Sequence, residues 1–114
     1  MIEIIRGDDV ELEFTFTDID GNAVDLTEST IFFTVKKYAR DEDADALIVK
    51  DFDFVGTGTS GILTLWLEAE ETDIDVGVYS YDVQVLDKEG YVFSSQAGKL
   101  KVNRDITVRT TISA

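Results

Sequence analysis

Apolar and polar residues alternate along much of this chain. Between residues 10 and 16 every second residue is apolar, and the residues in between are Glu or Thr. A period of two is typical of a strand with one buried face and one wet face. A period of two recurs in residues 30–37, 61–67 and 77–86. The chain is therefore predicted to be built mainly from β-strands.

Three further segments complete the predicted set of strands. Residues 47–54 form a short strand, which we place at the edge of a sheet because three charged residues interrupt it. Residues 91–103 form the last long strand, with a bulge expected at Gly98. Residues 2–5 are β-prone, and we expect them to form the first strand of the same domain.

Turn signals separate these strands at intervals of about ten residues. An Asp-Gly step at residues 20–21 and the segment 87–90 indicate tight turns, and residues 55–61 are rich in glycine. Residues 39–46 form either a loop or a single helical turn, and residues 68–75 a short helical crossover between sheets. The spacing predicts an all-β, antiparallel β-sandwich of about seven or eight strands.

Large apolar side chains on the alternating faces are the candidate core. The residues expected to converge between the two sheets are Phe14, Phe33, Leu65, Tyr81 and Val83. The chain has no Cys pair that could join the sheets. Contacts of Tyr81 with Trp66 and with the two Phe rings are therefore expected to hold them together.

Length and composition fit a single folded domain. The chain has 114 residues, of which 44% are hydrophobic, enough for one core without disulfides. We assign residues 1–103 to the sandwich and residues 104–114 to a β-prone C-terminal arm. The chain contains neither Cys nor His. This composition excludes disulfides, thiolate metal sites and His-based catalysis.

The formal net charge of the chain is −14. A field of that sign repels phosphate backbones and favours docking to a basic protein surface. No stretch approaches the roughly 20 apolar residues of a membrane span, and the first residues lack the apolar run of a signal peptide. We therefore expect no nucleic-acid partner and no membrane association.

One group of oxygen ligands could hold a calcium ion. Its members are the clustered Asp18, Asp20, Asn22 and Asp25. Hard cations prefer such ligands, but the spacing lacks the EF-hand pattern and its distal Glu. Asx residues also cap tight turns through local hydrogen bonds, which is the preferred interpretation, so no metal or cofactor is expected. The acidic run at residues 41–45 is interpreted as a solvated loop that could also meet a basic partner.

Two pairs of neighbouring carboxylates, Glu70 with Glu71 and Asp73 with Asp75, could serve glycoside hydrolysis. That reaction needs a substrate cleft, for which a sandwich of this size has little room, so solvated acidic side chains are the preferred interpretation. The tripeptide Arg-Gly-Asp at residues 6–8 is too short a signal to indicate cell adhesion. The chain is not expected to be an enzyme.

The segment Asp75-Val76-Gly77-Val78-Tyr79-Ser80-Tyr81 is the most specific local signal. It resembles the F strand of immunoglobulin-like domains, with Tyr81 where antibody domains place a Cys. The resemblance implies a tyrosine corner, in which the buried Tyr79 bonds through its hydroxyl to upstream backbone and Gly77 permits a close approach. Trp66 lies in the wrong strand for the antibody tryptophan, so the expected fold is immunoglobulin-like without being of the antibody type.

A wider resemblance covers nearly the whole chain. Its motifs, in order, are residues 5–9 (Ile-Arg-Gly-Asp-Asp), residues 17–27, residues 31–36, residues 61–65, the acidic crossover and residues 77–85. This order is similar to the small immunoglobulin-like domains of tailed-bacteriophage virion proteins. These include the N-terminal domain of baseplate upper proteins and domains of tail accessory, head-fibre and capsid-decoration proteins.

The resemblance implies a non-catalytic structural protein of the virion, made in the host cytoplasm. It would bind other capsid or tail proteins and form a homo-oligomer in the assembly. A capsid-decoration, head accessory, neck or tail-attached role is favoured over a baseplate adaptor that anchors a receptor-binding protein. The reason is that baseplate upper proteins continue into long helical regions. An alternative of another class is a bacterial surface module that binds a ligand or carbohydrate.

The C-terminal arm carries the candidate partner-binding residues Ile106, Val108 and Ile112. These residues are β-prone and lie outside the main set of strands. One interpretation is that the arm forms an extra edge strand of its own domain. The other is that it adds to a neighbour's sheet by β-augmentation. The sequence leaves both interpretations open.

Overall fold

The structure, a computed structural model, describes residues 1–104, except for the side chains of residues 93–96. Its strands are β1 (Ile2–Ile5), β2 (Val10–Thr15), β3 (Thr30–Lys36), β4 (Ile48–Asp53), β5 (Ile62–Leu67), β6 (Gly77–Leu86) and β7 (Val92–Asn103). Two short helices, η1 (Asp43–Asp45) and α1 (Ala69–Thr72), lie between strands. The predicted all-β chain with a helical crossover is confirmed. The candidate partner-binding residues of the arm lie outside the described residues.

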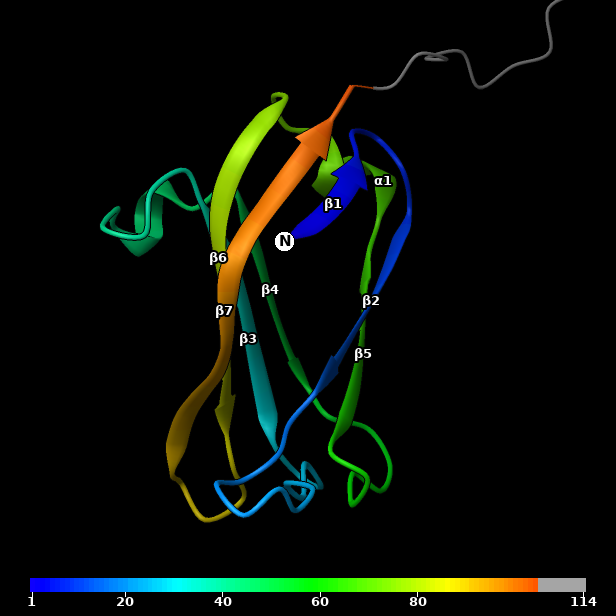
Figure 1. Ribbon diagram of the computed structural model, residues 1–114, viewed down its shortest axis with the longest axis vertical. Coiled ribbons are helices and arrows are strands. Elements are labelled where there is room, and N and C mark those ends of the chain that lie inside the picture. The colour runs from blue at the N-terminus through cyan, green and yellow to red at the C-terminus, as the bar shows by residue number, and fades with distance from the viewer. Residues whose placement is uncertain (105–114) are drawn as a thin grey trace, which may run out of the picture.

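The strands form two layers (Figure 1). One sheet has the strand order β1-β7-β6-β3-β4, and the other consists of β2 and β5. The first strand departs from the antiparallel expectation, because β1 pairs in parallel with β7. Both strands end beside α1: the Arg6 amide donates to the Asn103 carbonyl, and the Gly7 amide donates to the Thr72 carbonyl. The domain is thus a sandwich with one large and one small sheet.

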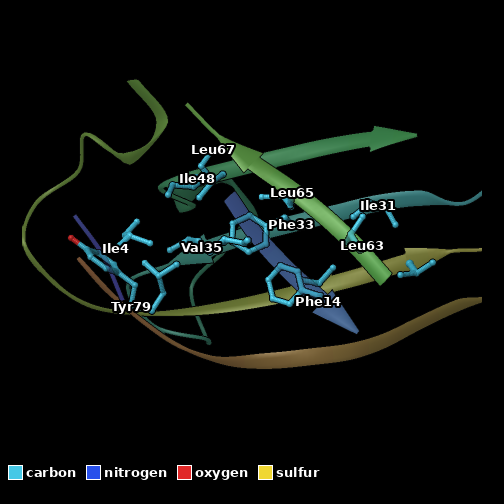
Figure 2. Packing of buried hydrophobic residues seen from close by; sticks show 14 of the residues in the cluster. Ile4, Phe14, Ile31, Phe33, Val35, Ile48, Leu63, Leu65, Leu67 and Tyr79 are labelled. Carbon is cyan, nitrogen blue, oxygen red and sulfur yellow. The ribbon is translucent and has the colours of Figure 1, made fainter. Parts of the chain in front are cut away.

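The core lies between the layers, where the alternating residues of each strand meet. Ile31, Phe33 and Val35 of β3 are fully buried. The equivalent residues of β5, Leu63, Leu65 and Leu67, are 0–1% exposed. Figure 2 shows these side chains packed together between the sheets. Burying apolar surface is the main force that favours folding, so this cluster holds the layers together.

Three aromatic rings connect the layers at the centre of the core. The ring centroid of Phe14 on β2 lies 6.2 Å from that of Phe33 on β3 and 6.1 Å from that of Tyr81 on β6. The centroids of Phe33 and Tyr81 are 6.1 Å apart. Tilted pairs at this separation add to the free energy of burial. The expected contact of Tyr81 with the two Phe rings is confirmed.

The expectation that Trp66 belongs to this cluster is wrong. Trp66 is 56% exposed and lies on the outer face of β5, opposite Glu11 of β2. Successive residues of a strand point to opposite faces, and the Leu residues on either side of Trp66 point inward. The register that buries three Leu residues therefore places the indole outside.

The bulge in β7 is not at Gly98. Gly98 pairs regularly with Tyr81, and the register shifts farther along, where Val83 pairs with Gln96 and Gln84 pairs with Ser94. A Cβ at Gly98 would lie 3.3 Å from the Tyr81 ring. Glycine at this position therefore leaves room for the ring of its cross-strand partner.

The helix α1 carries the chain from the small sheet to the large one, as the sequence predicted for residues 68–75. Glu68 and Glu71 form a capping box at its N-terminus. A helix of four residues is not stable by itself, and Thr72 anchors it. The Thr72 side chain is buried, and its hydroxyl donates to the Asp8 carbonyl at 2.7 Å. Within residues 1–104 no helix is long and apolar enough to cross a membrane.

Replacing Phe33 with Ala is expected to lower the free energy of unfolding by about 3–5 kcal/mol, because it leaves a cavity at the centre of the core. Trp66→Ala is the matched aromatic control and should cost less than about 1 kcal/mol, since the indole is mostly in water. Urea unfolding followed by circular dichroism measures both. Equal losses in the two variants would contradict the outward placement of Trp66.

Candidate functional site

The edges of the two sheets are the first candidate for a binding site. Within the described part of the chain, β1 and β4 bound the large sheet, and β2 and β5 each pair only with one another. An edge strand presents unpaired backbone N–H and C=O groups, on which another chain can form a further strand. Proteins usually protect such edges with charged residues, bulges or short strands. The four edges of this domain differ in that protection.

The β4 edge is protected by a charge that points inward. Lys50 pairs with Phe33 across the ladder, and so lies on the core side of β4. Its ammonium donates to the Glu71 carboxylate at 2.8 Å, and both side chains are about a quarter exposed, at 27% and 28%. The edge position of β4 was predicted correctly, but this ion pair was not. The sequence signal for an inward Lys50 was its spacing of two residues from both Ile48 and Phe52, which puts the three side chains on the same face of the strand.

The ion pair also shifts the titration of Glu71. Burial works to raise the pKa of Glu71, but the backbone amide of Glu68 and the Lys50 ammonium outweigh burial. The pKa of Glu71 is therefore held below its ordinary value of 4.5. The ionised carboxylate stabilises the folded chain by joining α1 to the edge of the large sheet.

Two other edges have protection of a simpler kind. The β1 strand has only four residues. The outer face of β2 carries Glu11 and Glu13, both exposed. Short edge strands and charged side chains both discourage pairing with other chains.

In the part of the chain that the structure describes, the β5 edge shows none of these devices. Its six residues, Ile-Leu-Thr-Leu-Trp-Leu, include no charged side chain. On its outer face Ile62 is 42% exposed and Trp66 is 56% exposed. Among the described strands, an apolar edge strand of this kind is the one at which another chain binds most readily.

Two of the candidate calcium ligands, Asp18 and Asp25, cap turns through their side chains. One oxygen of Asp18 accepts from the backbone amides of Asp20 and Asn22, each at 2.9 Å. Asp25 accepts from the Thr27 amide at 2.9 Å. These are the local bonds of Asx turns, the interpretation that the sequence favoured. No group of three or more acidic side chains suited to a metal ion occurs among the residues described.

A polar hollow of about 390 Å³ lies on the outer face of the large sheet, next to the acidic loop of residues 41–45. Its lining residues are Phe32, Thr34, Lys36, Asp43, Val49, Asp51, Asp82 and Gln84. Lys36 donates to the Asp43 carboxylate at 2.7 Å and to the Asp41 carbonyl at 3.0 Å. Burial raises the pKa of Asp82, and Asp43 adds to that rise while Lys36 opposes it. The loop is thus tied down by Lys36, although Asp43 itself is 96% exposed.

Tyr79 has the geometry expected of a tyrosine corner. Its side chain is 3% exposed, and its hydroxyl donates to the Asp75 carbonyl four residues upstream. Burial raises the pKa of this hydroxyl. The role expected for Gly77 is not supported, because a Cβ there would meet the Tyr79 ring at 3.8 Å, an ordinary contact. The corner depends on the Tyr79 ring and on the Asp75 backbone.

Two of the carboxylates considered for catalysis are engaged in ion pairs. Glu71 is bound to Lys50, and Asp73 accepts from Arg6 at 3.0 Å. Glu70 and Asp75 are exposed. Arg6 of the Arg-Gly-Asp tripeptide is therefore engaged within the domain. Both ion pairs thus connect segments that lie far apart in the sequence.

Comparison with models of known protein families and with curated protein sequences finds no match to this chain. The structure by itself defines the class: within residues 1–104 it is an all-β sandwich of two unequal sheets, whose edge strand β5 carries no charged side chain.

Replacing Tyr79 with Phe is expected to lower the free energy of unfolding by about 1–2 kcal/mol, because the partly buried hydrogen bond to the Asp75 carbonyl is lost while the ring is kept. Tyr91→Phe is the control, since Tyr91 is 67% exposed and its change should be negligible. Thermal and urea unfolding measure both. A neutral Tyr79→Phe would show that the corner contributes nothing to stability.

The stability that depends on Glu71 should be lost at acid pH. A carboxyl group whose folded pKa is lowered stabilises the chain above its ordinary value of 4.5, and this contribution fades as pH falls through the lowered pKa. Glu71→Gln should therefore be less stable than the wild type at pH 7, and the gap should close below pH 4.5. Lys50→Met should remove part of the same dependence, because the Glu68 amide remains. A gap that is constant with pH would contradict this assignment.

Proposed function

We propose that this chain is an immunoglobulin-like module that acts without catalysis, by binding other proteins of a bacteriophage virion. A capsid-decoration, head accessory, neck or tail-attached role fits best. The observation that carries the proposal is the β5 edge, which has no charged side chain and no second strand neighbour among residues 1–104.

The strand order supports the immunoglobulin-like part of the proposal. In that fold one sheet contains strands C, F and G, extended by C′ in variable-type domains, and the other contains B and E. The order β7-β6-β3-β4 corresponds to G-F-C-C′, and β2-β5 corresponds to B-E. The helical crossover α1 then joins E to F.

The aromatic cluster supports it further. Antibody domains join strands B and F by a disulfide, against which a Trp of strand C packs. Here Phe14 on β2 and Tyr81 on β6 touch at those two positions, and Phe33 on β3 packs against both. Tyr79 precedes Tyr81 by two residues, as the corner tyrosine precedes the second Cys. Packing of these three rings therefore joins the two sheets, as the disulfide and the Trp do in antibody domains.

A fold does not define a function, so the function must come from the surface. The order of sequence motifs resembles phage virion domains, and an acidic chain is suited to basic partner surfaces in a dense assembly. Strand addition at β5 would supply main-chain hydrogen bonds with a partner. A baseplate adaptor that anchors a receptor-binding protein would use the same edge.

A second candidate rests on the polar hollow. Its mixture of Phe32, Lys36 and Asp82 with hydroxyl and amide groups is suited to a small polar ligand such as a sugar. This feature favours the alternative of a bacterial surface module that binds carbohydrate. A glycan array with the wild type and Asp82→Asn tests it, and a sugar lost in the variant would support this alternative.

Purified particles from the phage or prophage that encodes the chain provide the test of the first candidate. We expect mass spectrometry to detect the chain at a fixed ratio to the capsid or tail proteins. Cryo-electron microscopy should place the sandwich on the particle surface and distinguish head from tail. Absence of the chain from particles that assemble normally would overturn the proposal.

A further inference from the structure

The hollow on the outer face of the large sheet is built from two cross-strand rows. In one row, Phe32 of β3 lies beside Asp51 of β4. In the next row, Thr34 of β3 lies between Val49 of β4 and Asp82 of β6. The two residues of β3 alternate with its buried residues, so their side chains point away from the core. The hollow therefore brings together a ring, an apolar side chain and two carboxylates.

The lining of the hollow has more negative than positive charge. Three of its residues are carboxylates and one is a lysine. The ammonium of that residue, Lys36, donates to the Asp43 carboxylate and to the Asp41 carbonyl, both in the acidic loop. Among the side chains that the structure describes, none forms an ion pair with Asp51 or Asp82. Two carboxylates thus face the hollow without a counter-charge.

The titration of Asp82 agrees with this lack of counter-charge. Burial raises the pKa of Asp82 above its ordinary value of 3.8, and Lys36 offsets only part of the rise. A raised pKa means that the ionised form is disfavoured where it stands. A further cation in the hollow would favour the ionised form.

The strands that flank β3 and β6 do not supply that cation. The lysines of β4 and β7 have other partners: Lys50 binds Glu71, Lys99 donates to Ser80, and Lys101 pairs with Glu3. A basic group brought by another molecule would supply the missing charge, and the net charge of −14 would attract it.

A guanidinium group matches this lining better than a neutral sugar does. It can pair with a carboxylate through two hydrogen bonds and stack on the ring of Phe32, while its aliphatic stem packs along Val49. A neutral sugar would take Asp51 and Asp82 out of water without a counter-charge, which costs free energy.

The surroundings of the hollow favour a protein as the source of the guanidinium. Leu47 and Val49 lie two residues apart at the start of β4, and their side chains are 45% and 55% exposed. Exposed apolar side chains that lie together mark surfaces at which proteins bind. Arginine is enriched in such interfaces, whereas a free small ligand would not cover this apolar flank.

We propose that the hollow binds an arginine side chain presented by a partner protein, with the guanidinium against Asp51 and Asp82 and the stem along Phe32 and Val49. This inference deepens the proposed function and rests on its premise that the domain works by binding other proteins. It gives the chemistry of the partner surface, and it places a second contact on the large sheet.

A peptide titration followed by NMR tests the proposal on the full chain. The probes are acetyl-Gly-Arg-Gly-amide and the same peptide with citrulline, which keeps the shape of arginine and lacks its charge. We expect the arginine peptide to shift the backbone amides of residues 32, 34, 49, 51 and 82. The citrulline peptide should bind at least about tenfold more weakly, because it forms no charge-assisted hydrogen bond. Equal binding of both peptides, or shifts spread evenly over the acidic surface, would overturn the proposal.

Charge removal tests the two carboxylates. Asp82→Asn and Asp51→Asn are each expected to weaken binding of the arginine peptide by roughly three- to tenfold. Asp53→Asn is the matched control, because Asp53 lies on the same face of β4 but outside the lining of the hollow. It should weaken binding by less than about twofold, through the net charge alone. A loss in Asp53→Asn as large as that in Asp82→Asn would contradict the proposal.

A loss of binding in Asp82→Asn can be separated from a loss of folding. A carboxyl group whose folded pKa is raised lowers the stability of the folded chain wherever it is ionised. Asp82→Asn should therefore unfold at the same temperature as the wild type at pH 7, or at a higher one. Thermal unfolding followed by circular dichroism checks this expectation.

Two competing occupants are outcomes of the same experiments. If Arg109 of the chain itself filled the hollow, Arg109→Gln would raise the affinity for the arginine peptide by about tenfold or more. That gain would overturn the proposal, which expects no change. A neutral glycan that binds through Asp82, in a chain that does not bind the arginine peptide, would overturn it in favour of a carbohydrate site.

The two proposals fail in different ways. If virions contain the chain but the arginine peptide does not bind at the hollow, the proposed function stands and this inference falls. If the peptide binds there through Asp51 and Asp82 but virions lack the chain, the inference stands and the virion role falls.

Discussion

The contact of Phe14, Phe33 and Tyr81 is the constraint on which the rest of this structure depends. The three rings come from both layers and meet at centroid separations of 6.1–6.2 Å. No disulfide can share the task, because the chain has no Cys. Burial of large apolar side chains therefore has to fix the register of the sheets, and a slip of one residue would turn every inward side chain toward water.

The unequal width of the sheets determines what remains available for binding. Two strands cannot cover the whole inner face of a five-stranded sheet. The edge strands of the large sheet are protected against pairing in other ways. At β4 this is the inward Lys50 with Glu71. The uncharged β5 has no equivalent. Within residues 1–104, Phe52 of the large sheet is only partly buried, and β5 of the small sheet has a single strand neighbour.

Several of the carboxylates of the chain have local structural tasks. Asp18 and Asp87 each accept backbone amides within their own turns. Glu68 and Glu71 cap α1. A chain without Pro makes its turns with Asx residues and glycine, and this accounts for part of its acidity.

The sequence by itself determined which segments are strands and, for most, which face is buried, because side chains alternate with a period of two and turns need particular residues. It also indicated that β4 lies at the edge of a sheet and that Tyr79 forms a tyrosine corner. Only the tertiary structure decided the parallel pairing of β1 with β7, the outward side of Trp66, the place of the bulge and the Lys50–Glu71 pair. The physical reason is that these features depend on which strands become neighbours. Strand β5 has apolar residues on both faces, so its own pattern could not choose between them, and the choice came from the side chains it meets across the core.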